Sequence, residues 1–573
     1  MKLTALINFI LLINISFIKD IKGEQISEDT LLELTIPQIQ TLMKNNDLTS
    51  YELVKYYLSR IGLYEDKINA TLSVNHNSLS VAKKLDKERQ EGIIRGPLHG
   101  IPIAIKDNIH TKNMPTTAGT LAFENLFPPY DATLVKNLKD AGAIIIAKTV
   151  LTEMANWMVL GMPNNYSAVG GYSYNPYDFR KDPRPGRDDG RGVLPTGSSS
   201  SGSGTASNFW VANIGTETVN SVIGPASATM LVAIKPTIGR ISRWGIIPVS
   251  YDQDSAGPMT RTVEDAAILL GVLEGKKSDP NDKMTSRCSK PVNNDYKQFL
   301  DKSGLQGKRI GIPKKWFVDK FKLPGKKEAS GGIPDDQKDI LKEAISILER
   351  QGATVLTSTE IPSAISQDWS NNSLVRGSCT IGPSFKGFDE QCSVVLKYSF
   401  KRDFNAWLQT LGDFAPVSSL TQFREWNIKN THKGTLKYAQ HTLDISDEMD
   451  LNSKKDYLRY NADRKRDIIL SGEQGVDKVL EEYELDALLF IGSRGSRFLA
   501  KAGYPSVIVP FGFVDNISGN LNNYPSNFNR KPSPIGITFS GTECSEPSLI
   551  SIAYAFEKAS MKRVPPILES YER

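Results

Sequence analysis

The sequence predicts a single large α/β domain, in which helices cover both faces of a mixed β-sheet. Segments of helical periodicity alternate along the chain with short runs of apolar, β-branched residues. Hydrophobic residues make up 39% of the 573 residues and charged residues 23%, a composition typical of a globular protein with a large core. No internal repeat divides the chain, and strand patterns resume after each polar stretch, so one domain is favoured over several.

The N-terminal part of this domain predicts helices followed by a buried strand. Residues 31 to 63 have helical periodicity, and Thr49-Ser50 caps a predicted helix over Tyr51 to Arg60. Ile101 to Ile105 form a short, continuous apolar run with β-branched residues, which is typical of a buried strand. Such a strand delivers Lys106 at its end.

The alternation continues through the rest of the chain. Ala132 to Ala141 predicts a helix, and Ala143 to Ala147 predicts the next buried strand. Strand patterns resume at Arg309 to Pro313 and at Asp486 to Ile491. Residues 182 to 195 are too rich in Gly, Pro and charge for either element, so we expect an exposed loop there.

The first 23 residues have the pattern of a secretory signal peptide: a charged start at Lys2, an apolar run, and Gly23 before a plausible cleavage point. We therefore expect a secreted mature domain of residues 24–573. A membrane anchor is the alternative, but the run is shorter than the roughly 20 apolar residues of a spanning helix, so no span is predicted. Four N-glycosylation triplets fit a secretory route, although such triplets also arise by chance: they begin at Asn69, Asn165, Asn371 and Asn516.

Charge and cysteine usage limit the partners. The formal net charge of +5 is small and the basic residues are spread out, so no nucleic-acid partner is indicated. The cysteines form no CxxC and have no neighbouring His, so no metal or other cofactor is predicted. In an oxidising compartment one or two disulfides are expected, with Cys379 and Cys392 the best local pair, and four buried thiols are the alternative. The oligomeric state is left open.

Two loops of small residues follow the predicted strand that ends at Lys106. Gly197 to Gly204 is dense in Gly and Ser, which lets backbone approach a ligand closely. A flexible linker is the alternative, but this stretch lies between ordered apolar segments. It is followed by a second small-residue loop, Ile214 to Ser227. A serine nucleophile needs an arrangement of this kind.

A serine nucleophile also needs a base, and histidine is a poor candidate here. The five histidines form no Ser/His/Asp signature, and no GxSxG motif is present. A lysine can serve instead if burial lowers its pKa from about 10.4 toward neutrality. Lys106 follows five mostly apolar residues, so its burial is expected.

The sequence resembles the amidase signature family of serine hydrolases from about residue 30 to the C-terminus. The blocks that carry the resemblance are Gly100 to Asn108, the Ser-rich stretch through Gly215-Thr216-Glu217 to Arg240, Gly257 to Asp265, and Ala502-Gly503-Tyr504-Pro505 with Pro534 to Ile537. Several blocks in the right order are a much stronger signal than a single motif.

The resemblance implies three catalytic residues. Lys106 matches the catalytic lysine, Ser199 the serine that follows a cis peptide bond, and Ser221 the acylated serine. The base would act on Ser221 through the hydroxyl of Ser199. Among the neighbouring serines, Ser200 is the next candidate for that role. Asp107 and Glu217, by contrast, are expected to hold loop amides.

The resemblance also implies that backbone N–H groups before the nucleophile stabilise an oxyanion. The residues of this loop are Thr218, Val219, Asn220 and Ser221. Val219 and Asn220 depart from the family, which usually has Gly or Asp and then Gly at these positions. The interval of 22 positions from Ser199 to Ser221 is also slightly shorter than the family's. Both departures affect how well the backbone N–H groups of this loop can stabilise an oxyanion.

The implied function is hydrolysis of the C–N bond of a small-molecule or peptide-terminal amide. An amidase-like binding protein with impaired catalysis is the alternative that Val219 and Asn220 motivate. An aminoacyl-tRNA amidotransferase component is less favoured, because a secretory leader places the chain in the wrong compartment. The sequence leaves open whether a fatty acyl, peptide C-terminal or small aromatic amide is cleaved.

Overall fold

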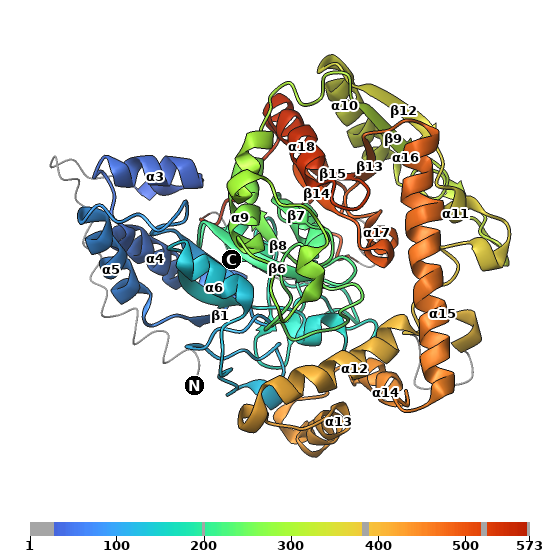
Figure 1. Ribbon diagram of the computed structural model, residues 1–573, viewed down its shortest axis with the longest axis horizontal. Helices are drawn as coiled ribbons and strands as arrows, with labels where there is room; N and C mark the ends of the chain where they lie inside the picture. The colour runs from blue at the N-terminus through green and yellow to red at the C-terminus, as the bar shows by residue number, and fades with distance from the viewer. Residues whose placement is uncertain (1–27, 198–200, 381–388, 517–523, 570–573) are drawn as a thin grey trace.

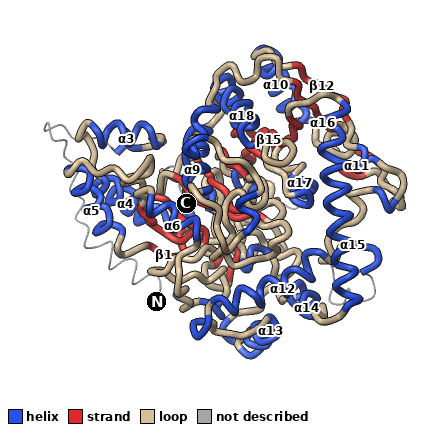
Figure 2. Tube along the Cα trace, in the orientation of Figure 1, coloured by secondary structure: helices blue, strands red, loops and turns tan. Residues whose placement is uncertain are grey.

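The structure is a computed structural model, which describes residues 28–197, 201–380, 389–516 and 524–569. Its centre is an 11-stranded mixed sheet, as the sequence predicts (Figures 1 and 2). In spatial order the strands are β1 (Thr71–Val74), β3 (Ile144–Thr149), β2 (Pro102–Lys106), β6 (Ala212–Glu217), β8 (Ser255–Thr260), β7 (Val232–Lys235), β14 (Ser506–Val514), β15 (Ser533–Ser540), β13 (Ala487–Ile491), β9 (Arg309–Pro313) and β12 (Thr354–Thr359). The C-terminal strands β14 and β15 therefore lie in the middle of the sheet.

Strand direction sets which side chains can meet at the edge of the sheet. β2 pairs in parallel with both β3 and β6. The pairs of β6 with β8, β8 with β7, β7 with β14, and β14 with β15 are antiparallel. Because β2 and β6 are parallel neighbours, their carboxyl ends lie at the same edge of the sheet.

Helices cover both faces of this sheet, because side chains along a strand alternate between its faces. Val507 and Val509 of β14 belong to the main apolar core, together with residues of α9 (Val263–Glu274) and α18 (Glu546–Ser560). Ile508, between them, packs instead with residues of α7 (Ser201–Ala206) and α8 (Ile223–Ala228). The prediction of helices on both faces is thus confirmed.

The remaining helices surround this centre. They are α2 (Glu28–Leu31), α3 (Ile36–Lys44), α4 (Ser50–Ile68), α5 (Ser78–Gln90), α6 (Thr133–Asp140), α10 (Asp335–Arg350), α11 (Pro362–Ile365), α12 (Val395–Thr410), α13 (Leu420–Lys429), α14 (His441–Asp447), α15 (Lys454–Ser471), α16 (Lys478–Glu482) and α17 (Ser496–Ala502). Two short hairpins, β4 (Tyr166–Ser167) with β5 (Gly171–Tyr172) and β10 (Lys320–Phe321) with β11 (Ser330–Gly331), complete the regular structure. No helix in the described ranges is both long and apolar enough to cross a membrane.

A second apolar cluster is formed by residues of α12, α13 and α14, the helices at the bottom of Figure 1, together with residues of the loops that they cover. Its centre is aromatic: Phe404 of α12 contacts Phe123, Trp407 and Phe423 with ring centroids 5.4 to 6.2 Å apart. These buried rings hold the helical layer against loops near the carboxyl end of β2.

The predicted elements near the N-terminus are present, with small differences in length. Thr49 caps α4 through a capping box with Glu52, and the helix continues beyond the predicted Arg60 to Ile68. β2 ends at Lys106, as expected. The loop of residues 182–195 is irregular but only partly exposed, because Arg184 is buried with its guanidinium 4.2 Å from the ring centroid of Tyr524.

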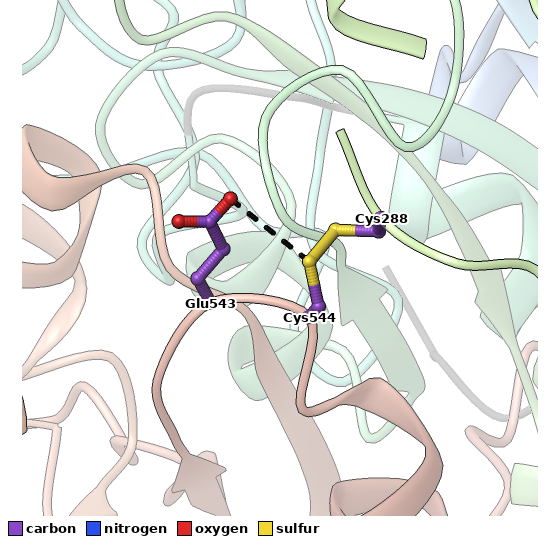
Figure 3. A group of neighbouring side chains, drawn as sticks. All are labelled: Cys288, Glu543 and Cys544. Carbon is purple, nitrogen blue, oxygen red and sulfur yellow. Dashed lines mark hydrogen bonds between the residues drawn. A yellow bond between two sulfur atoms is a disulfide. The ribbon is translucent and has the colours of Figure 1, made fainter. Parts of the chain in front are cut away.

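Two disulfides join the four cysteines. Cys379–Cys392 confirms the predicted local pair, whereas Cys288–Cys544 joins residues 256 positions apart. The expectation of free buried thiols is therefore wrong. Glu543, beside Cys544 in Figure 3, forms an ion pair with Arg287, so a salt bridge accompanies the long-range disulfide.

Candidate active site

Lys106 and the loop that contains Ser221 lie at the same edge of the sheet. β2 ends with Lys106, and its parallel neighbour β6 ends with Glu217, directly before the loop. The side-chain nitrogen of Lys106 donates a hydrogen bond to the backbone oxygen of Thr216, at 3.0 Å. The lysine is thereby held at the start of the loop that carries the predicted nucleophile.

Lys106 is completely buried. Burial lowers the pKa of this amine to about 7, although the negative charges of Asp254 and Glu217 act in the opposite direction. A lysine with this pKa is largely neutral at slightly alkaline pH, so it can accept a proton. The burial expected from the apolar strand is therefore present, together with its electrostatic consequence.

Asp254 holds the first residue of the loop. The hydroxyl of Thr218 donates to Oδ1 of Asp254, and the backbone N–H groups of Val249 and Ser250 donate to Oδ2, each at 2.9 Å. The side-chain amide of Gln253 donates to the backbone oxygen of Thr218 at 3.2 Å. Burial raises the pKa of Asp254 to about 7. Sequence reasoning missed this residue, because its contact with the loop is made to Thr218, 36 positions away along the chain.

Glu217 fixes the other side of the nucleophile. Its Oε2 accepts hydrogen bonds from the backbone N–H groups of Val222 and Ile223, at 2.7 and 2.9 Å. These N–H groups lie at the start of α8, where they have no partner within the helix, so the carboxylate caps that helix. Ser221 immediately precedes them and is 7% exposed. Glu217 therefore holds loop amides, as expected from the sequence.

Asp107, which follows Lys106, also has a structural role. Its carboxylate accepts a hydrogen bond from the backbone N–H of Thr117 at 3.0 Å and forms a buried ion pair with Lys148 at 3.4 Å. Burial raises the pKa of Asp107, and Lys148 opposes that shift. The contacts brace the chain beyond β2, and no described contact joins Asp107 to the loop before Ser221.

The unusual side chains before Ser221 are accommodated by neighbouring parts of the fold. Val219 packs against the apolar cluster of α12, α13 and α14. Asn220 lies against Gly224, where an added Cβ would come within 2.8 Å of its Nδ2. The Oδ1 atom of Asn220 is buried and has no hydrogen-bond partner among the described residues. Gly224 thus makes room for the Asn220 side chain.

Ser199 lies outside the described residues, as do Ser198 and Ser200. The residues on either side of this gap contact α8. Gly197, at φ +75°, lies so close to Pro225 that an added Cβ would be 2.6 Å from the Pro225 nitrogen. A Cβ added to Gly202 would likewise be 2.7 Å from the side-chain oxygen of Thr229. The described residues on both sides of this gap are therefore packed against α8 and the residue that follows it.

A cavity of about 320 Å³ lies beside α8, between the ends of β13 and β14 and the start of β15. Gly224 and Ser227 form its wall on the α8 side, and Arg494 lies on the β13 side. Sequence reasoning did not identify these lining residues. Two groups have metal-ligand spacing, Cys288 with Glu543 and Cys544, and Cys379 with Asp389 and Cys392, but their sulfur atoms are joined in disulfides and offer no thiolate.

Comparison with known proteins gives one consistent result. The family model described as Amidase matches residues 52–364. A probable amidase of Arabidopsis thaliana is 33% identical over 546 residues, covering 94% of this chain and 92% of that protein. The solved structure of native peptide amidase from Stenotrophomonas maltophilia covers 94% of this chain and 99% of its own, with 31% identity and a TM-score of 0.77.

A second group of relatives matches only part of the chain. One of them, a glutamyl-tRNA(Gln) amidotransferase component of Lawsonia intracellularis, is 39% identical over 295 residues, which are 51% of this chain and 56% of that protein. The similarity to amidases therefore extends much further along the chain than the similarity to this amidotransferase.

Proposed function

This chain belongs to the amidase family and hydrolyses amide C–N bonds, and we propose that it does so through an acyl-enzyme formed on Ser221. The observation that carries the proposal is the placement of Lys106. Its buried amine has a pKa of about 7 and donates a hydrogen bond to the backbone oxygen of Thr216, at the start of the loop that contains Ser221. The required parts of an acyl-transfer site are a nucleophile, a base and oxyanion donors, and this edge of the sheet holds candidates for each.

In the proposed acylation step, the neutral amine of Lys106 takes the hydroxyl proton of Ser221 through the hydroxyl of Ser199. The Ser221 oxygen attacks the amide carbon, and backbone N–H groups of the loop from Thr218 to Ser221 donate to the resulting oxyanion. The Lys106 ammonium then returns the proton, by the same route, to the departing nitrogen. The C–N bond breaks and leaves an ester on Ser221.

Deacylation reverses these roles with water as the nucleophile. Lys106, neutral again after the amine has left, takes a proton from water through Ser199. The hydroxide oxygen attacks the ester carbon, and the returned proton releases Ser221 and the carboxylic acid. One base thus serves both half-reactions, and neither step needs a cofactor.

An amidase-like protein without catalysis is the alternative reading of Val219 and Asn220. The packing of both side chains argues against it, since Val219 lies in the apolar cluster and Asn220 against Gly224. Their backbone N–H groups remain part of the loop, and those groups, not the side chains, stabilise an oxyanion. The amidotransferase alternative is weaker still, because the sequence similarity to that relative covers about half of the chain.

The test is covalent labelling by a fluorophosphonate combined with turnover of a panel of primary amides. We expect wild-type protein to take the label and release ammonia, and Ser221→Ala to do neither. Thr421→Ala, which removes an exposed hydroxyl on α13, is the matched control and should behave as wild type. Equal labelling and turnover by wild type and Ser221→Ala would rule out Ser221 as the nucleophile.

We also propose that the chain is exported and loses residues 1–23. The support comes from the charged and apolar N-terminal pattern and from two disulfides, which persist in oxidising compartments. N-terminal sequencing of protein from culture medium should begin near Glu24. Retention of Met1 in secreted material, or recovery only from the cytosol, would contradict the proposal.

A further inference from the structure

The cavity beside α8 begins close to the proposed nucleophile. Gly224, in its wall, follows Ser221 by three residues and lies in the first turn of α8. Ser227, one turn further along α8, also lines the cavity, so the helix leads from Ser221 along the cavity wall. The cavity is thus placed to receive the part of a substrate attached to the carbonyl carbon.

The volume of the cavity limits the size of that part. About 320 Å³ is near the lower end of the range of about 300 to 1,000 Å³ for small-molecule sites. A short acyl group fits such a volume better than a long fatty chain. The polar residues among those that line it are Ser227, Gln337, Ser493, Arg494, Asp515, Asn516 and Ser533.

Arg494 is the cation of this cavity, and its charge has no local counterion. Among the described residues, no carboxylate lies within ion-pair distance of its guanidinium. One terminal nitrogen donates to the backbone oxygen of Gly332 at 2.5 Å, and Nε is buried without a partner. Burial lowers the pKa of Arg494, and no neighbouring charge opposes that shift.

Several other partly or fully buried arginines of this chain bind carboxylates, whereas Arg60 and Arg261 donate to backbone oxygens, as Arg494 does. Arg180, Arg184 and Arg191 each bind the carboxylate two positions earlier, at 2.5 to 2.7 Å. Asp515 lines the same cavity as Arg494, but it forms no ion pair with it and is exposed. The guanidinium of Arg494 lies 5.7 Å from the ring centroid of Trp316, so its described neighbours are uncharged. A desolvated guanidinium without a carboxylate partner, on a residue that lines a cavity, is suited to an anionic ligand.

We propose that this cavity is the acyl subsite of the enzyme and that Arg494 pairs with a carboxylate on the acyl part of the substrate. The preferred substrates are then short amides with an anionic acyl group, such as monoamides of dicarboxylic acids. This inference rests on the proposed function of Ser221, because it assigns a substrate class to that site. Arg494 acts here as a specificity residue and takes no part in proton transfer.

The test compares a matched pair of substrates, the monoamide of glutaric acid and pentanamide, which share a five-carbon acyl chain but differ in the terminal carboxylate. Wild type should prefer the anionic amide in kcat/KM. Arg494→Gln should lower kcat/KM for the anionic amide by about 10- to 100-fold, the usual value of a hydrogen bond to a charged group, and leave pentanamide within about twofold. Arg494→Lys should give a kcat/KM for the anionic amide between those of wild type and Arg494→Gln.

Arg309→Gln is the matched control, because Arg309 also donates to backbone oxygens, those of Tyr483 and Glu484, but does not line the cavity. It should leave the substrate preference unchanged. Equal effects of Arg494→Gln on both amides, or no preference in wild type, would overturn the subsite while leaving the role of Ser221 intact.

Direct binding separates the subsite from catalysis. Glutarate, which has no amide to cleave, should bind to Ser221→Ala protein in a calorimeter, and the additional change Arg494→Gln should weaken that binding at least tenfold. If no amide is hydrolysed but glutarate binding still depends on Arg494, the proposed function fails and the anion site stands. If glutarate does not bind, or binds equally to both proteins, the subsite is wrong.

Discussion

The hydroxyl of Thr218 donates to the carboxylate of Asp254 across 2.5 Å, so a residue of the proposed oxyanion loop contacts a group that also affects the pKa of Lys106, the proposed base. Asp254 raises the pKa of Lys106, against the larger effect of burial. One carboxylate thus links the geometry of the loop to the protonation of the lysine. The electrostatics of this edge of the sheet can therefore be tested by changing Asp254, which is not one of the three proposed catalytic residues.

Asp254→Asn should move the acidic limb of the pH profile of kcat/KM to lower pH. Removing the negative charge makes the Lys106 ammonium less favourable, so its pKa falls further below its ordinary value. The maximal rate should also fall, because the amide cannot accept all the hydrogen bonds that the carboxylate accepts. Thr218→Val is the control for loss of the loop contact alone. A limb that moves to higher pH would contradict the electrostatic role of Asp254.

In the wild-type enzyme kcat/KM should rise with pH through about 7 and then level off. The active form requires the neutral amine of Lys106, whose pKa is about 7, so the base is lost as pH falls below that value. Lys106→Ala should lower kcat by a factor of about 10² to 10⁴. A chelator should not change the rate. An activity that stays constant down to pH 5, or is lost with the chelator, would count against this assignment.

Asn220→Gly should retain turnover or broaden the range of amides accepted. The side chain of Asn220 lies against Gly224 and does not supply the oxyanion donors, so its removal opens space beside the cavity wall. Initial rates over a panel of amides, with Ser221→Ala as the inactive reference, measure the effect. Complete loss of fluorophosphonate labelling in Asn220→Gly would show that this side chain is required for the loop.

If the secreted chain is N-glycosylated, Asn371 should be the principal site. It is the exposed member of the four, whereas Asn165 and Asn516 are buried and the Asn69 amide donates to the backbone oxygens of Gly170 and Tyr172. Treatment with a glycosidase should lower the mass of the wild-type protein. Asn371→Gln should abolish this change in mass, and Asn165→Gln should not. A glycan that persists on Asn371→Gln protein would contradict this ranking.

All four cysteines should resist alkylation in folded protein until a reductant is added, as two disulfides require. Replacing Cys379 and Cys392 together by Ser should lower the free energy of unfolding by about 3 kcal/mol in the chain-entropy description of a short closed loop. Intact-mass analysis and denaturant unfolding measure these effects. Free alkylation of Cys379 and Cys392 without reductant would remove the basis for this prediction.

Local signals predicted the parts of the site that lie on regular elements. The apolar run from Ile101 to Ile105 has a length and composition typical of a buried strand, and Lys106, which follows it, is also buried. The cap at Thr49 depends on residues three positions apart, so it too is visible in sequence. The role of Ser199 remains a prediction, since that residue lies outside the described ranges.

Features that depend on distant segments could not be predicted in the same way. Cys288 and Cys544 are brought together only by the order of strands in the sheet. Loop composition at residues 182–195 indicated exposure, but Arg184 is buried by an ion pair with Asp182 and by the distant ring of Tyr524. The significance of Arg494 lies in the absence of a nearby carboxylate among the described residues, which is a property of the folded environment.

The position of β14 in the centre of the sheet has a consequence for biosynthesis. β7 ends at Lys235, and its partner β14 begins only at Ser506, so one edge of β7 stays unpaired until most of the chain has left the ribosome. An open strand edge of this kind can pair with other chains. Nascent chains of this enzyme should therefore depend on chaperones, and truncation before β14 should yield aggregates instead of a smaller folded hydrolase.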